Sequence, residues 1–155
     1  MTVFRRSAAM GLGLGLIGLG ILGIALTWAA WQPCAVDQTT EDCYATMGGP
    51  GHLVPLQIIW LISIGLATGA FAVGRTIVER TLSAIALGLV IVMNYLTEYA
   101  LWLGFAGGHW DVPPGTGYTQ SAALVVAGVV VAIGASMPSR SDSRADEHRG
   151  VRPAV

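Results

Sequence analysis

The sequence predicts an all-α integral membrane protein with four transmembrane helices, both termini in the cytoplasm, short loops and a disordered carboxy-terminal tail. Composition, four long apolar runs and the placement of the arginines carry this prediction. Of 155 residues, 54% are hydrophobic and 11% are charged, and the mean hydropathy is +0.64. A soluble domain carries roughly a quarter charged residues. The chain is therefore assigned to the membrane class before any motif is considered.

The four apolar runs are each close to the roughly 20 residues that cross a ~30 Å hydrocarbon core. They are separated by segments rich in glycine, proline or charge, which predict loops. The short segment 1–7 precedes them, and the tail 138–155 has mixed charge and few large apolar residues, which predicts disorder. The transmembrane domain covers 8–137, and its predicted spans are residues 8–31, 54–74, 82–105 and 119–137.

The first apolar run has two interpretations, because a basic start followed by an apolar stretch is also typical of a secretory signal peptide. Arg5 and Arg6 precede the run. It is longer than a usual signal core and ends in Trp28 and Trp31 rather than at a small-x-small cleavage site. We expect it to be retained as a membrane helix.

Arginine placement predicts the orientation. All eight basic residues are arginines, and all fall on one side of the four-span arrangement. The positive-inside rule then places both termini and the turn at 75–80 in the cytoplasm of a multi-pass protein of the plasma or inner membrane. The tryptophans fall near the opposite, exoplasmic ends, as an aromatic belt predicts: Trp28, Trp31, Trp60, Trp102 and Trp110.

Several chemistries lack the residues they need. The chain has no lysine, which excludes a Schiff base to retinal or pyridoxal phosphate. Gly13, Gly15 and Gly18 match the dinucleotide-binding fingerprint, but they lie inside an apolar span, without the strand and helix amino terminus that the fingerprint requires. We expect no cofactor, no nucleic-acid partner and, on balance, no enzymatic activity.

Cys34 and Cys43 lie in the first exoplasmic loop, where the surroundings are oxidising. We expect a disulfide between them. The alternative is a zinc or copper site made by these two cysteines with His52 and His109. The spacing disfavours it, because structural zinc ligands usually come in closely spaced pairs.

Glu98 is the most unusual residue, since a carboxylate inside a spanning helix costs several kcal/mol unless it is compensated. In a continuous helix it would share a face with Asn94, roughly 10 Å from the exoplasmic end. The expected polar cluster contains Asn94, Glu98, Gln57, Gln120, His52 and His109. It either holds the helices together, which we favour, or forms a proton or cation site.

Small residues recur at four-residue spacing, which lets membrane helices approach closely. The pairs expected to pack are Gly65 with Gly69 and Ala84 with Gly88. The expected function is that of a non-enzymatic accessory or scaffold subunit in the bilayer, which contacts other membrane subunits or itself. The alternative is a small proton- or cation-coupled transporter, or a redox or metal-handling protein, that uses Glu98 and the histidines.

Overall fold

The structure is a computed structural model that describes residues 2–49, 51–105 and 112–137. Within these ranges the chain is entirely helices and their connections, in agreement with the predicted class. The tail 138–155, His109 and Trp110 lie outside the described residues. The helices are α1 (Thr2–Trp31), the 3₁₀ helix η1 (Gln32–Cys34), α2 (Glu41–Gly48), α3 (Leu53–Val73), α4 (Ile77–Val92), α5 (Tyr95–Phe105) and α6 (Tyr118–Ser136).

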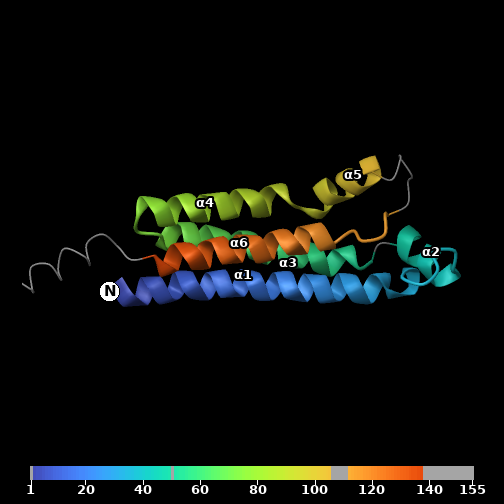
Figure 1. Cartoon of the computed structure of the whole chain (residues 1–155), viewed down its shortest axis with the longest axis horizontal. Helices are drawn as coiled ribbons and strands as arrows, with labels where there is room; N and C mark the ends of the chain where they lie inside the picture. Colours follow the sequence, from blue (N-terminus) through green and yellow to red (C-terminus); the bar gives the residue numbers. More distant parts are fainter. Residues whose placement is uncertain (1, 50, 106–111, 138–155) are drawn as a thin grey trace, which may run out of the picture.

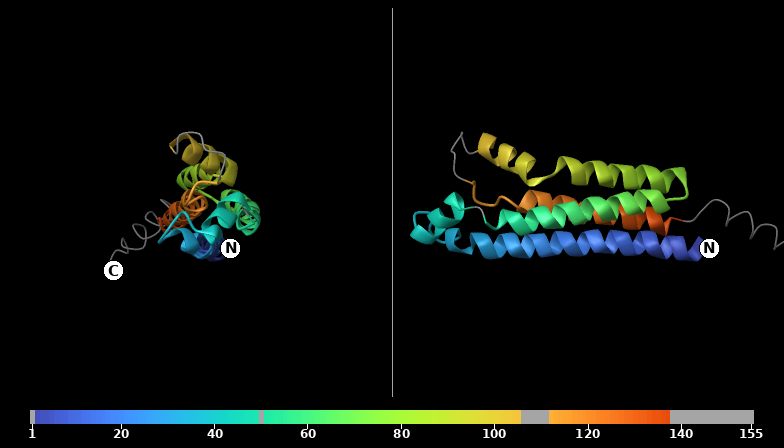
Figure 2. Two further views of the ribbon diagram at one scale, coloured as in Figure 1. Left: turned by 90° about the vertical axis from the view of Figure 1, so that its right-hand side faces the viewer. Right: turned by 180° about the vertical axis from the view of Figure 1, so that it is seen from behind.

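Four helices, α1, α3, α4 and α6, lie side by side along the long axis (Figure 1). An end-on view shows them around one core, with α6 between α1 and α4 (Figure 2). We call the end that carries 32–49 and 112–117 the loop end. The end that carries Arg6, 74–76 and Ser136 is the arginine end. The core is formed by Leu16, Leu56, Val90, Leu124 and Val131, with smaller residues between them.

Three helices, α1, α3 and α6, are long and apolar enough to cross a membrane, and α4 and α5 together give a fourth if the bent pair is one span. Large apolar side chains cover the outside of the bundle, including Ile21, Leu61 and Ile85, which are each more than half exposed. An apolar surface of this extent is not tolerated in water and suits lipid. The chain is therefore a membrane protein.

The third predicted span is wrong as a continuous helix. Its helix begins at Ile77 rather than residue 82, because Thr76 and Glu79 form a capping box. It then ends at Val92 and restarts at Tyr95, and the two parts, α4 and α5, are bent by 62°. The first predicted loop also differs, since it contains η1 and α2.

Glycines bring α1 and α6 into backbone contact. A Cβ added at Gly128 would lie 2.5 Å from the Gly13 carbonyl oxygen, and one at Gly20 would lie 2.7 Å from the Ser121 carbonyl oxygen. Contacts this short exclude any side chain, so these glycines set the distance between the two helices. This interface explains why α6 is the most buried of the three long apolar helices, since 50% of its most apolar stretch lies inside the bundle.

The predicted packing pairs are mostly on the outside. A Cβ at Gly65 or Gly88 would meet no atom within 4 Å, and Ala84 is exposed. Gly69 does lie against a neighbouring helix, 3.5 Å from Leu12 by the same measure. Gly65, Ala84 and Gly88 therefore do not pack against the described helices of this chain, because small-residue spacing does not tell which face of a helix is buried. Their packing against another protein stays a prediction.

Candidate functional site

Glu98, in the first turn of α5, is completely buried. Its Oε1 accepts a hydrogen bond from the backbone N–H of Thr119 at 2.7 Å, and its Oε2 accepts one from the N–H of Gln120 at 3.3 Å. The Trp102 indole N–H donates to Oε1 at 3.4 Å. The partner of this acid is therefore the amino terminus of α6.

This arrangement stabilises both the buried Glu98 carboxylate and the free N–H groups at the amino terminus of α6. The first N–H groups of a helix have no partner inside it, and the helix dipole is positive there, so the position stabilises an anion. The preceding residue, Gly117, has a φ of 115° and supplies no side-chain cap. Glu98 supplies the cap that the sequence of α6 lacks, and α6 compensates the carboxylate in an apolar surrounding.

A charged side chain also caps the other end of α6. The Arg6 Nε donates to the Ala135 carbonyl oxygen at 2.8 Å, and a second guanidinium nitrogen donates to the Ser136 carbonyl. A cation at a helix carboxyl terminus satisfies free carbonyls and complements the dipole. Helix α6 is thus closed by a carboxylate from α5 and a guanidinium from α1.

Arg80 plays the same part for α3, since its Nε donates to the Gly74 carbonyl oxygen at 3.0 Å. Arg6 and Arg80 are therefore structural residues as well as contributors to the charge asymmetry of the chain. Their side-chain contacts were not predicted, because sequence spacing alone does not show which helix end an arginine reaches.

The break between α4 and α5 leaves carbonyls that the helix itself does not satisfy, and those of Val90, Ile91 and Val92 have other partners. The Trp60 indole of α3 donates to the Val90 carbonyl at 2.6 Å, the Asn94 backbone N–H donates to Val92 at 3.1 Å, and the Asn94 Nδ2 donates to Ile91 at 3.4 Å. Unpaired backbone groups are costly in lipid, where no water replaces the missing bond. These hydrogen bonds therefore stabilise the break between α4 and α5 as part of the fold.

Asn94 also starts the next helix. Its Oδ1 accepts a hydrogen bond from the Thr97 backbone N–H at 3.0 Å, as an amino-terminal cap does, while its backbone oxygen accepts from the Glu98 N–H at 3.0 Å. Asn94 and Glu98 therefore do not share one uninterrupted helix face as predicted. Asn94 sets the turn that places Glu98 against α6.

Replacing Asn94 with alanine is expected to destabilise the protein by about 1 kcal/mol, the usual cost of losing an amino-terminal cap. Serine at this position should lose less, because its hydroxyl can still accept from Thr97. Thermal unfolding in detergent and amide hydrogen exchange at Thr97 measure both effects. Equal melting and equal exchange in Asn94→Ala and the unaltered protein would refute the capping role.

The predicted glutamines lie at the same end of the bundle. Gln120 is buried, and its Nε2 donates to the Leu56 carbonyl oxygen at 3.2 Å. Within the described residues, the Oε1 atoms of Gln120 and Gln57 have no hydrogen-bond partner. The structure thus joins Glu98 to Gln120 through the backbone N–H of Gln120, while Gln57 is a half-buried residue of α3 with a free amide oxygen.

The loop end is tied down by the disulfide between Cys34 and Cys43, the pairing expected from the sequence. Both cysteines are buried, with Trp31 and Val112, in a second small core. The two loops also bond directly, since the Val112 N–H donates to the Met47 carbonyl oxygen at 3.2 Å. The disulfide therefore anchors α2 and the end of α1 over the second loop.

His52 lies at the start of α3, edge-on to Trp31 with 5.1 Å between the ring centres. Burial lowers the pKa of His52, and a hydrogen bond with the Thr116 backbone opposes that shift. Its Nε2 has no partner among the described residues. His52 thus lies beside Trp31 and the Thr116 backbone at the loop end, and its ordinary state in the fold is the neutral imidazole.

Lowering the pH is expected to destabilise the fold through His52. The pKa of His52 in the folded protein lies below its ordinary value of 6.5, so the unfolded chain binds the proton more readily. The stabilisation is therefore fully present above pH 6.5 and is lost as the pH falls from there through the folded pKa. Melting temperatures measured between pH 7.5 and about 5 should fall more steeply for the unaltered protein than for His52→Phe. Parallel curves would contradict this assignment.

The metal alternative gains no support from the described residues. No group of three or more histidine, cysteine or acidic side chains is close enough there to hold a metal ion, and Cys34 and Cys43 are bonded to each other. His109, the fourth expected ligand, lies outside the described residues.

Comparison of the chain with models of protein families, with curated proteins and with solved structures finds no match.

Proposed function

We propose that the chain crosses the cell membrane four times, with the arginine end in the cytoplasm and the loop end outside. The third crossing is the bent α4–α5 pair. At 1.5 Å per residue, α4 is about 24 Å long, and α5, tilted by 62°, adds about 8 Å along the same direction. The sum, about 32 Å, matches the ~30 Å hydrocarbon core.

We propose that the protein is a non-enzymatic accessory or scaffold subunit of a larger membrane assembly. The observation that supports this most is the structural use of Glu98 and Asn94 inside the bundle. Glu98 caps α6, and Asn94 terminates α4 and begins α5. Both oxygens of Glu98 already accept N–H donors, so a transported proton or cation would compete with the amino terminus of α6 for the same carboxylate charge.

The small residues of α4 supply the proposed contact surface. Ala84 and Gly88 lie one turn apart on its exposed face, next to the exposed Ile85 and Ile91. A shallow strip of small residues flanked by large apolar side chains is the shape against which a second membrane helix packs. The partner expected here is a transmembrane helix of another subunit.

Purification in a mild detergent, followed by identification of the proteins that accompany the chain, tests this function. A membrane protein should copurify in fixed ratio, and Ala84→Leu with Gly88→Leu should release it. Gly18→Leu is the matched control, because a Cβ at Gly18 of α1 also meets nothing within 4 Å. Isolation of a stable monomer with proton- or cation-coupled transport that Glu98→Gln abolishes would overturn the proposal.

A further inference from the structure

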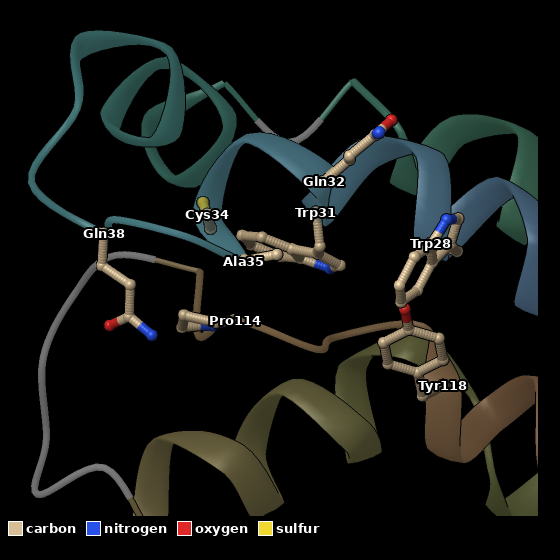
Figure 3. Close-up of a pocket in the computed structure, with 8 residues that line it drawn as sticks. All are labelled: Trp28, Trp31, Gln32, Cys34, Ala35, Gln38, Pro114 and Tyr118. Carbon is tan, nitrogen blue, oxygen red and sulfur yellow. The ribbon is translucent and has the colours of Figure 1, made fainter.

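A cavity of about 240 Å³ opens at the loop end, between the carboxyl end of α1, η1 and the segment that enters α6 (Figure 3). Its lining includes three aromatic residues, Trp28, Trp31 and Tyr118, and two glutamines, Gln32 and Gln38. Trp31 is held in place, since its indole N–H donates to the Thr116 carbonyl oxygen at 3.0 Å. Trp28 is 62% exposed and forms the rim.

The electrostatic surroundings of this cavity favour a cation. Among the described residues, its lining contains no charged side chain. Asp37 directly precedes the lining residue Gln38, and Glu41 and Asp42 follow in the same loop-end segment. Hydrogen bonds from the Thr39 side chain and backbone lower the pKa of Asp37, so this residue carries its negative charge at neutral pH. The described arginines lie at the opposite end of the bundle.

We propose that this pocket binds a quaternary ammonium group between Trp28 and Tyr118, next to the buried ring of Trp31. The negative face of an aromatic ring attracts a cation, and several rings around one ammonium form the usual binding cage. A quaternary ammonium needs no hydrogen-bond acceptor, which suits a lining whose described polar side chains, Gln32, Gln38 and Tyr118, are uncharged amides and a hydroxyl. The group belongs either to a lipid headgroup of the outer leaflet or to a free small molecule.

The test is equilibrium dialysis of labelled tetramethylammonium against the full chain in maltoside detergent. Saturable binding is expected, and Trp28→Ala should weaken it about tenfold, equivalent to the loss of one desolvated cation–π contact. Phe105→Ala is the control, because Phe105 is an exposed aromatic residue of α5 outside the pocket. Tyr118→Phe should bind almost normally, since the ring is retained.

Two further arms complete the experiment. Neopentyl alcohol, an uncharged analogue with a similar tertiary-butyl group, should not compete, and competition by it would show apolar binding only and overturn the proposal. So would an absence of saturable binding, or equal binding by Trp28→Ala with an unchanged melting temperature. In nanodiscs, displacement of tetramethylammonium by phosphatidylcholine and not by phosphatidylglycerol assigns the site to a lipid headgroup. Equal binding in both lipids assigns it to a free ligand.

Discussion

Replacing Glu98 with alanine is expected to lower the free energy of unfolding by about 3 kcal/mol, because two buried N–H groups of α6 and one indole N–H lose their acceptor. Glu98→Gln should cost roughly 1 kcal/mol, since an amide oxygen still accepts one N–H but the charge that complements the helix dipole is lost. Unfolding by a denaturing detergent, titrated against a mild one, measures both changes.

Glu41→Ala is the control for Glu98, because Glu41 is an exposed acid in the first turn of α2. Its loss should change stability by no more than about 0.5 kcal/mol. If Glu98→Ala is as stable as Glu41→Ala, the carboxylate does not cap α6. If Glu98→Gln is as damaging as Glu98→Ala, an accepting oxygen is not what the site requires.

Gly128→Ala is expected to be as damaging as Glu98→Ala. The new Cβ would lie 2.5 Å from the Gly13 carbonyl oxygen and 2.8 Å from the Ile17 backbone nitrogen, so the backbones of α1 and α6 would have to separate. Overpacking of this kind costs about 3 kcal/mol at a rigid contact. Separation would also pull Arg6 away from the end of α6, which adds to the loss.

The matched control is Gly18→Ala, which places the same methyl group on the same helix pair where nothing lies within 4 Å. Its melting temperature should equal or slightly exceed that of the unaltered protein, because alanine is the better helix former. Equal stability of Gly128→Ala and Gly18→Ala would mean that α1 and α6 are not in backbone contact.

The helices that the sequence predicts well are those that length and apolarity alone define. The runs at 8–31, 54–74 and 119–137 became α1, α3 and α6 with boundaries close to the prediction, because an apolar run without a polar interruption has no alternative to a helix in lipid. The amino terminus of α1 begins earlier, at Thr2, since no residue there stops a helix.

The break at Asn94 was missed because neither proline nor glycine marks it. The available signal was an asparagine in an apolar run with Thr97 three residues later, a pattern that favours a helix start over a helix interior. The other half of the break is Trp60, which is 30 positions away from Val90 in the sequence. A pattern within one segment does not reveal such a contact.

The partner of Glu98 was predicted only in part. Gln120 was expected near Glu98 as a side chain, whereas the contact is made by the backbone N–H groups of Thr119 and Gln120. The free backbone N–H groups at a helix start do not appear in a pattern of side chains. Gly117 was the available signal, because it has no side chain to cap α6. The small-residue spacing of α3 and α4 did not show which residues pack inside the bundle, because spacing alone does not tell which face of a helix its neighbours cover.

The proposed orientation of the bundle determines where Glu98, the aromatic pocket and the proposed contact surface lie relative to the two sides of the membrane. Its most direct test labels single cysteines with an impermeant maleimide in intact cells, in a background with Cys34 and Cys43 replaced by alanine. A cysteine at Asp37, at the loop end, should react from outside, and one at Arg75, at the arginine end, should react only after the membrane is permeabilised. Labelling of Arg75→Cys, and not of Asp37→Cys, in intact cells would contradict the account.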